Sequence, residues 1–556
     1  MLLFEIITPR VERSETPKAV KIEIFNAMKR PAVYTTLIFA LLIASACEKD
    51  FEELNRNPFY PTQTDIGPLF NTAVNSLRLG WNEQFYMHNE TLYGLTQQAA
   101  LTAATFQNIN IGTEEAWSSY YSALAHIREI EDRLDAMEVE PEALYNARAM
   151  VKILLAYKTF RLTDLFGDIP FFDAGKGFQS LEYARPKFDS QEEIYKYQLD
   201  ELKWAAEHID ASLNPTTPSG KPYVTFGTFD NLFNGDMALW RRFANALRLR
   251  HAIRMADKDP AYAGPIIKDI LENSLPLIRD GEDVLMVPAA QDWRNESVNW
   301  SFREHKKLRM GTTAWRQLSA NDNTDGSGIF DPRAYIFFET NNAGEWAPFP
   351  QIPEPGTPPS GGIPYQQHRD TNYPVKGTSN IYSPFNYYLI RDEKDVPEII
   401  LTAAEVHFLK AEAYLRGLGV GVDEGEAEGE YTLGVVASIQ FWQDVMANCG
   451  IWENKSPILT QGEIFAITNH PRVSIFTAED KLEHIYAQRW LDAFRQPWEA
   501  YALARRTGLT PHEGAPIGHY RFPYPPSEAE NNADNWAAQV SKMVEDSERV
   551  KVWWMP

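Results

Sequence analysis

Two tryptophans bracket a run of polar residues in the stretch QDWRNESVNWSFREH. Trp293 and Trp300 enclose Arg294, Asn295 and Asn299. Indole rings offer flat apolar faces, and amide or guanidinium groups beside them can hydrogen-bond to a ligand. This combination suits an oligosaccharide, because a sugar ring has an apolar face and a rim of hydroxyls. A peptide would need similar platforms, and packing of the rings within their own loop is the other interpretation.

Two further stretches carry the same residue types. NNAGEWAPFPQ contains Trp346 and Phe349, and ATFQNIN contains Phe106, Gln107 and Asn108. Their rings could stack on a ligand, and the amides could bond its rim. For each of these aromatic residues, core or loop packing is again the alternative to ligand contact.

No pattern for catalysis or for a bound cofactor accompanies these stretches. The chain has no His-Glu-x-x-His pair, no Gly-x-Ser-x-Gly elbow and no glycine-rich phosphate loop. Its 11 histidines are scattered. A pair of carboxylates that cleaves glycosides would leave no local pattern, so that chemistry stays open. We predict no catalytic residues, no cofactor and no resident metal.

The stretch NDNTDGSGIFD is the one candidate for calcium. Asn321, Asn323, Asp325 and Gly326 match the residue types at the first positions of an EF-hand loop. The twelfth position needs a bidentate glutamate and holds Pro332 instead, so an EF-hand is excluded. An irregular calcium site is possible, and a tight Asx-rich turn is the interpretation we favour.

A cysteine near the beginning of the chain predicts where the protein resides. Two basic residues, a short apolar run and three small residues precede Cys47, which is the layout of a bacterial lipoprotein signal over residues 28–46. The apolar run is shorter than the roughly 20 residues that span a bilayer. We therefore expect Cys47 to carry lipid. A plain secretory signal, with Cys47 incidental, is the alternative.

The residues on either side of this signal differ in character. Residues 1–27 carry four glutamates, which are unusual in an export signal, so we interpret them as a mis-assigned upstream extension. Residues 47–60 are interpreted as an acidic tether. Loss of residues 1–46, with six Lys/Arg and four Glu, changes the net charge from −23 to about −25. Such acidity argues against nucleic acid as a partner, because phosphate binding depends on Lys and Arg.

Apolar periodicity predicts helices over most of the remaining chain. Leu124, Ile127, Ile130, Leu134 and Met137 recur at spacings of three and four, and a similar stripe covers 150–160. The two helices would form a hairpin of repeat type. Further helices are expected within 186–209, with Asp189 or Ser190 as the N-cap, and over 235–257, 398–417, 431–450 and 480–508, the last one broken at a proline.

Helix signals stop in the middle of the chain. Between about 285 and 395 the sequence is rich in turn residues and scattered aromatics, without a helical stripe. We expect one domain, 61–556, in which helices present a loop-rich insert at about 285–395. Long irregular segments in helical proteins are often functional, so this insert is the expected binding region.

Eight segments together resemble the SusD/RagB family of nutrient-binding outer-membrane lipoproteins of Bacteroidetes. The resemblance runs from Cys47 to the C-terminus. Within the family, the chain is similar to the SusD-like branch with the WRRFANALRLR-type motif. The segments, in family order, are DFEELNRNP, LTDLFGDIPFFDA, PKFDSQEEIY, WRRFANALRLRHAIRM, FDPRAY, LTAAEVHFLKAEAYLRG, QRWLDAFRQPWEAYALARRTG and RFPYPPSEAENN.

The resemblance implies a fold, a location and partners. The fold would be mainly α, with tetratricopeptide-like helical hairpins as scaffold and an irregular loop-rich binding face. The protein would face the extracellular side of the outer membrane and act as a lid on a SusC-like TonB-dependent transporter, passing it an oligosaccharide or peptide. Asp331 and Arg333 of FDPRAY would hold the fold, as would ARRTG (504–508) and FPYP (522–525).

Rival functions stay open at this point. A surface-anchored glycosidase or peptidase would turn over a polymer. A peptide-binding lid would differ from a glycan-binding lid only in the chemistry of its loops. A purely structural lipoprotein would bind no nutrient.

Overall fold

Antiparallel α-helical hairpins make up most of the chain in the computed structural model. The structure describes residues 65–103, 108–213, 224–286, 307–359, 380–390, 396–450, 452–453 and 455–556. Within them, Asp65–Pro556 form one unit, while Cys47 and the predicted signal and tether lie outside the described residues. The fold is mainly α, as expected from the sequence.

Helices dominate the order of elements, and the strands are very short. The α-helices are α3 (Ile66–Asn75), α4 (Tyr93–Leu95), α5 (Ile109–Asp135), α6 (Tyr145–Phe166), α7 (Gln191–His208), α8 (Met237–Met255), α9 (Pro260–Glu272), α11 (Thr312–Leu318), α12 (Arg333–Phe337), α13 (Tyr387–Ile390), α14 (Ala403–Arg416), α15 (Glu424–Asn448), α16 (Gln461–Ile467), α17 (Lys481–Asp492), α18 (Pro497–Thr507), α19 (Pro526–Asn531) and α20 (Ala533–Met543). The other elements are the π-helix η1 (Glu83–Leu92), the 3-10 turns η2 (Pro141–Leu144), η3 (Leu181–Ala184), η4 (Gly227–Phe229) and η6 (Ala493–Arg495), and the strands β1 (Ala100–Leu101), β2 (Val284–Met286), β3 (Leu308–Arg309) and β4 (Glu398–Leu401).

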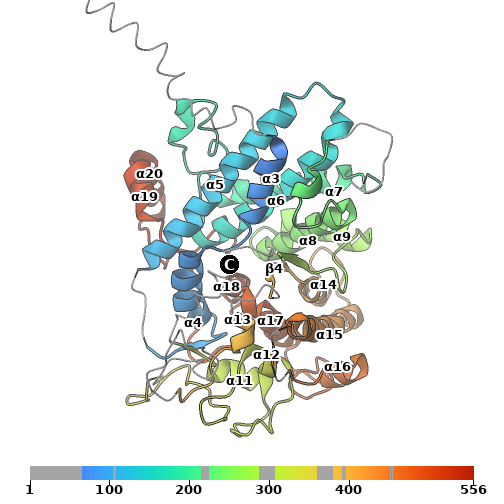
Figure 1. Cartoon of the computed structure of the whole chain (residues 1–556), viewed down its shortest axis with the longest axis vertical. Helices are drawn as coiled ribbons and strands as arrows, with labels where there is room; N and C mark the ends of the chain where they lie inside the picture. The colour runs from blue at the N-terminus through green and yellow to red at the C-terminus, as the bar shows by residue number, and fades with distance from the viewer. Residues whose placement is uncertain are drawn as a thin grey trace, which may run out of the picture. The chain divides into compact units, whose positions relative to one another are not determined.

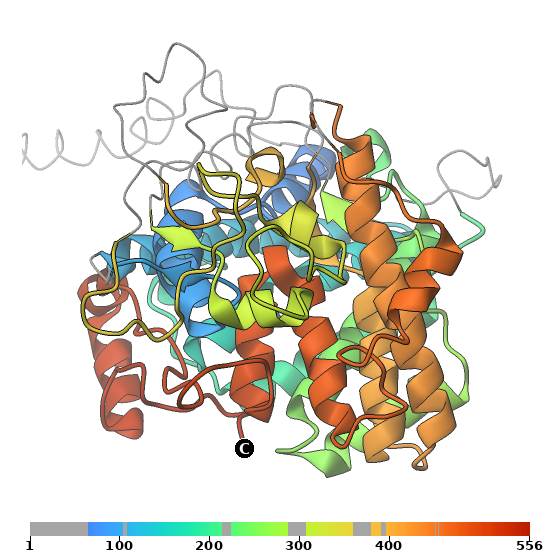
Figure 2. The ribbon, with the colours of Figure 1, turned by 90° about the horizontal axis from the view of Figure 1, so that it is seen from below.

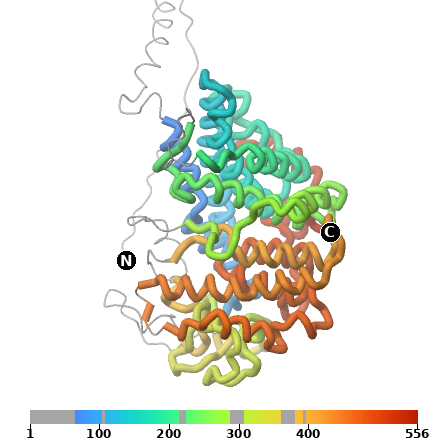
Figure 3. Tube along the Cα trace, turned by 90° about the vertical axis from the view of Figure 1, so that its right-hand side faces the viewer, coloured from blue at the N-terminus to red at the C-terminus, as the bar shows by residue number. Residues whose placement is uncertain are grey.

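The hairpins stack in layers along the chain. α5 packs on α6, α6 on α7, α7 on α8, and α8 on both α9 and α14. α14 and α15 then form the most extensive hairpin, followed by α17 and α18 (Figures 1 and 3). None of the helices in the described residues is long and apolar enough to cross a membrane.

Local sequence signals set the helix ends. The Ser190 hydroxyl accepts a hydrogen bond from the backbone N–H of Glu193, so that Ser190 and not Asp189 caps α7. α14 ends at Gly417, whose φ of 67° is the left-handed conformation that favours glycine. Pro497 opens α18 and separates it from α17, where its missing N–H costs no helical hydrogen bond.

Two arginines of α8 lie in the protein interior and join it to three other helices. Arg250 pairs with Glu405 of α14. Arg254, one turn later, pairs with Asp164 of α6 and with Glu499 of α18. All five side chains are almost fully buried. A buried charge is tolerated only when it is paired and hydrogen-bonded, so these contacts fix how the helices meet.

Two predicted fold-holding motifs form similar buried pairs. The Arg333 guanidinium donates a hydrogen bond to the Asp331 carboxylate at 2.6 Å. It also donates to the Gln488 side-chain oxygen and to the Ser438 hydroxyl. In ARRTG, the Arg506 guanidinium contacts both Glu412 oxygens, at 2.6 and 2.7 Å. The expected structural role of both motifs is confirmed.

The loop-rich segment lies at one end of the helical stack. In Figures 1 and 2 the yellow-green chain that contains α11 and α12 occupies this end. Its described residues contain only short helices, as the sequence predicts. Two antiparallel strand pairs tie it to the scaffold: β1 pairs with β3, and β2 pairs with β4.

Breaking the Glu412–Arg506 pair is predicted to destabilise the protein strongly. Burial opposes ionisation of Glu412, but Arg506, Arg416 and Arg489 outweigh it and hold its pKa at about 2. Glu412→Gln would leave buried guanidinium charge uncompensated, so urea denaturation should show a loss of about 3–5 kcal/mol. Glu272→Gln, which removes an exposed carboxylate on α9, is the control and should leave the urea midpoint near that of the wild type.

The same pair predicts a direction for acid unfolding. Because the pKa of Glu412 is lower in the folded than in the unfolded chain, its contribution is complete above pH 4.5. That contribution is lost as the pH falls from about 4.5 towards about 2. An acid titration in which Glu412→Gln loses as much stability as the wild type over this range would contradict the assignment.

Glu398 should have the opposite dependence. Burial raises the pKa of Glu398 to about 7. The charge of Arg161 and the hydrogen bond from the Leu79 N–H to the Glu398 carboxylate oppose this rise but do not outweigh it. Because the pKa of Glu398 is higher in the folded than in the unfolded chain, ionisation destabilises the fold above about pH 7, and this penalty is relieved as the pH falls from about 7 towards about 4.5.

Glu398→Gln is therefore expected to raise the melting temperature at pH 8 by about 2 °C and to lose this advantage at pH 5. Glu345→Gln, at an exposed carboxyl, is the control and should show no such difference between the two pH values. Equal effects of Glu398→Gln at both pH values would mean that this carboxyl is not the titrating group.

Candidate ligand-binding site

The β1–β3 pair joins the described chain that precedes one predicted ligand segment to the described chain that follows another. Ala100 pairs with Arg309 and Leu101 with Leu308, antiparallel. The Thr102 N–H then donates to the Lys307 carbonyl at 3.0 Å. The chain that leaves β1 and the chain that enters β3 therefore lie side by side, although about 200 residues separate them in the sequence.

Asn108 is described and lies exposed directly before α5, whereas the other candidate residues of both segments lie outside the described residues. In the sequence, Phe106 and Gln107 come after β1, and Trp293, Asn295, Asn299 and Trp300 come before β3. Their side-chain roles stay predictions. What the structure adds is that Thr102, before the first segment, is hydrogen-bonded to Lys307, after the second.

The third segment runs along the chain after β3. Phe349 forms a parallel bridge with Gly311, and its N–H donates to the Met310 carbonyl at 2.8 Å. The Thr312 N–H in turn donates to the Phe349 carbonyl at 3.0 Å. The third segment is thus anchored at the residues that directly follow β3.

Trp346 itself is a packing residue in the structure. Its side chain is 7% exposed. The indole stacks on Trp315, with ring centroids 5.8 Å apart, and meets the edge of Tyr335 at 5.6 Å. Phe349 is buried as well, against Tyr382. Between the two interpretations of Trp346, the described geometry supports loop packing.

An aromatic cluster that sequence reasoning missed lies at the beginning of η1. Trp81 and Phe85 stack with centroids 4.7 Å apart and planes 9° apart, and Tyr86 meets both rings at steep angles. All three side chains are partly exposed. The spacing i, i+4 in GWNEQFY was the available signal, since it places two rings on one helical face.

The cluster lies beside the first turns of α5. A side chain at Gly112 would meet Met87 and the Tyr86 Cβ, so glycine permits this close approach. The Glu115 carboxylate of α5 accepts a hydrogen bond from the Glu83 N–H at 2.7 Å and so joins α5 to the first residue of η1. Because α5 begins shortly after Phe106 and Gln107 in the chain, the cluster borders the region where we expect ligand contact.

The π-helical geometry of η1 is visible in its side-chain pairs. The Gln84 amide donates to Asn89, and the Thr91 hydroxyl donates to the Tyr86 carbonyl, both across five residues. This spacing belongs to the π-helix, which is rare and occurs frequently at functional sites. A contact of 3.9 Å between Lys307 and Glu90 ties η1 to the end of β3.

A buried ion pair lies under the first turn of η1, next to the aromatic cluster of Trp81, Phe85 and Tyr86. Glu83 pairs with Arg161, whose guanidinium lies 4.6 Å from the centre of the Trp498 ring. Burial raises the pKa of Glu83, although Arg161 opposes it, and burial together with Arg161 lowers the pKa of His88 well below its usual value. His88 is completely buried, so it can hold η1 in place but cannot exchange protons with a surface ligand.

The EF-hand-like stretch forms Asx turns. The Asn321 side-chain oxygen accepts the Asn323 N–H at 3.0 Å, and Asp325 accepts the Ser327 N–H at 2.9 Å. These oxygens are engaged within the loop, as the turn interpretation predicts. In the part of the chain that the structure describes, no cluster of three or more His, Cys, Asp or Glu side chains is suited to hold a metal ion.

Comparison with known proteins identifies the family. The family model SusD-like, described as starch-binding and associating with the outer membrane, matches residues 58–520. No curated protein matches the chain. Among solved structures, a chitin-binding protein superimposes with a TM-score of 0.67 at 23% identity, covering 88% of this chain and all of that one.

Two other structures agree in fold. A SusD homologue from Parabacteroides distasonis has a TM-score of 0.66 at 19% identity and covers 88% of this chain and 98% of that chain. A chitin-binding SusD homologue from Flavobacterium johnsoniae has a TM-score of 0.62 at 20% identity, with coverage of 88% and 98%. The chain therefore belongs to the SusD-like family of outer-membrane-associated nutrient-binding proteins, which are not enzymes.

Proposed function

We propose that this protein captures a glycan at the cell surface and serves as the lid of a SusC-like TonB-dependent transporter. The observation that carries the proposal is the partly exposed aromatic cluster of Trp81, Phe85 and Tyr86 at the beginning of η1, an element that the Lys307–Glu90 contact ties to the start of β3. Membership of a family of binding proteins removes the rival glycosidase and peptidase.

A glycan is favoured over a peptide as the ligand. Stacked, partly exposed aromatic rings offer a platform for the apolar faces of sugar rings, and the predicted ligand segments carry amide side chains suited to bond hydroxyls. Two structures of similar fold are described as chitin-binding. Oligosaccharides of N-acetylglucosamine are therefore the first ligands to test, with malto-oligosaccharides second because the family description names starch.

The anchor and the partner complete the proposal. A lipid on Cys47 would hold the protein at the outer membrane, and the acidic tether would keep its body in water. On the extracellular side, a lid that closes over a barrel could transfer an oligomer that cannot cross the membrane unaided. Association of the family with the outer membrane supports this placement.

Binding of chito-oligosaccharides should depend on the aromatic residues around β3. In isothermal titration calorimetry, we expect Trp81→Ala and Trp300→Ala each to weaken binding about tenfold, because each removes a stacking surface. Phe465→Ala is the matched control, since Phe465 is a 54% exposed aromatic on α16. It should leave affinity unchanged.

Three outcomes would count against the glycan proposal. One is no measurable binding of either oligosaccharide series. Another is binding that Trp81→Ala and Trp300→Ala leave intact. The third is that peptides, and not glycans, depend on these two residues, which would favour the peptide-binding lid.

Lipidation of Cys47 can be tested independently of the ligand. Mass spectrometry of protein from its native membrane should show a diacylated N-terminal peptide beginning at Cys47, and Cys47→Ala should abolish it. Affinity purification of the wild type should also recover a barrel transporter. An intact wild-type chain without acyl groups would contradict the anchor, whatever the glycan result.

A further inference from the structure

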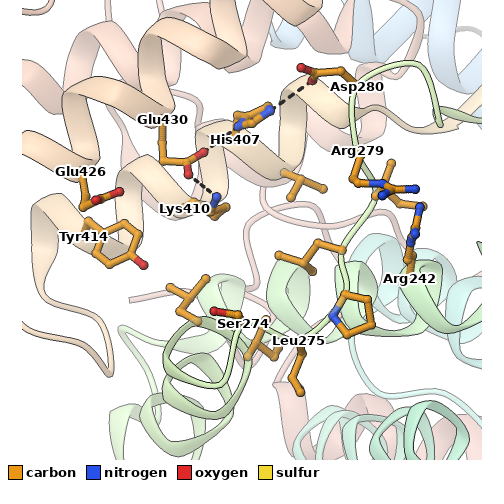
Figure 4. Close-up of a pocket in the computed structure, with 16 residues that line it drawn as sticks. Arg242, Ser274, Leu275, Arg279, Asp280, His407, Lys410, Tyr414, Glu426 and Glu430 are labelled. Atoms are coloured by element: carbon orange, nitrogen blue, oxygen red, sulfur yellow. Dashed lines mark hydrogen bonds and ion pairs between the residues drawn. The ribbon is translucent and has the colours of Figure 1, made fainter.

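A pocket of about 580 Å³ lies on the helical scaffold, between the chain that follows α9 and the α14–α15 hairpin. None of its lining residues belongs to η1, β1 or β3. Figure 4 shows the side chains that surround it. Its volume falls in the range of small-molecule sites, which is roughly 300–1,000 Å³.

The floor of the pocket is aliphatic. The residues that form it come from α9, from the chain after it and from α14: Ile270, Leu271, Leu275, Leu277, Ile278 and Val406. Ser274, at the beginning of this chain, has a φ of 48°, which is uncommon for a residue other than glycine. An aliphatic floor without an aromatic platform suits a hydrocarbon side chain better than a sugar ring.

One end of the pocket is cationic. Arg242 of α8 and Arg279 lie together there (Figure 4) and share a single carboxylate, Glu282. Asp280, the other carboxylate that lines this end, contacts the His407 ring, and no contact joins it to either guanidinium group among the described residues. The Arg279 side chain is 67% exposed, so it can turn towards a ligand. Guanidinium groups in this position are suited to bind a carboxylate through paired hydrogen bonds.

The opposite end is acidic. Glu426 and Tyr414 lie there (Figure 4), with Glu430 beside them. Glu430 is paired with Lys410 and with His407, but the Glu426 carboxylate and the Tyr414 hydroxyl have no hydrogen-bond partner among the described residues. Burial and the nearby glutamates raise the pKa of Tyr414. This end could therefore accept hydrogen bonds from an ammonium group.

A chain of contacts spans the pocket and fixes its width. The two ring nitrogens of His407 contact Glu430 at 2.6 Å and Asp280 at 3.2 Å. These contacts join α14 and α15 to the chain that carries Arg279. The cationic and acidic ends are thereby held apart across the aliphatic floor before any ligand arrives, which lowers the cost of ordering on binding.

From this arrangement we infer a second binding site, specific for short peptides with free termini and aliphatic side chains. The C-terminal carboxylate binds Arg242 and Arg279, the N-terminal ammonium binds Glu426 and Tyr414, and the side chains lie on the floor. The site is separate from the glycan site proposed at β3 and does not depend on it.

The test uses the purified mature protein and the tripeptide Leu-Leu-Leu in isothermal titration calorimetry. The free tripeptide should bind, and N-acetylation or C-amidation should each weaken binding about tenfold or more. Arg279→Ala should weaken the free peptide about tenfold and leave the amidated peptide unaffected. Glu426→Gln should likewise affect the free peptide and not the acetylated one.

Two controls assign any binding to the pocket. Lys203→Ala removes an exposed charge on α7, outside the pocket, and should have no effect. Trp300→Ala should also bind the tripeptide like the wild type. The inference is overturned if no binding is detected at about 10 mM peptide, if capped peptides bind equally well, or if Trp300→Ala abolishes binding while Arg279→Ala does not.

Discussion

The two arginines inside α8 are the constraint on which the rest of the scaffold depends. Arg250 and Arg254 lie one turn apart, and their carboxylate partners come from α6, α14 and α18. Removing one partner of such a pair costs several kcal/mol, because a charge is then left unpaired in the interior. Each helix consequently has one depth and one rotation at which the charges meet. The apolar stripes alone would tolerate small slips between hairpins, and the ion pairs do not.

A scaffold fixed in this way lets very short strands define the binding region. β1 and β3 contribute two residues each, far too few to be stable alone. They pair because the helices on either side hold their ends, and because η1 and the residues around Phe349 pack beside them. Stability therefore resides in the helices, and the segments that leave these strands can differ in sequence at little cost to folding.

The helices and their ends could be predicted from sequence because their signals are local. The cap at Ser190, the left-handed Gly417 and the break at Pro497 each follow from one residue and its neighbours. In the aromatic cluster, the i, i+4 spacing of Trp81 and Phe85 was visible in the sequence, but the π-helical geometry of η1 does not show in a 3.6-residue pattern. The burial of Trp346 could not be predicted, since its partner Trp315 is identified only by the fold. The β1–β3 pairing joins segments about 200 residues apart and has no local signal.

The two proposed sites differ in the physical interaction that they use. Aromatic stacking at η1 depends little on salt, whereas recognition of charged termini between Arg279 and Glu426 is screened by it. Coupling between them would require a second arrangement of the helices that connect them. The buried pairs of α8 leave no alternative register in which those charges remain satisfied. Ligands at the two sites should therefore bind independently, and a scaffold of this kind can carry two specificities without trading one against the other.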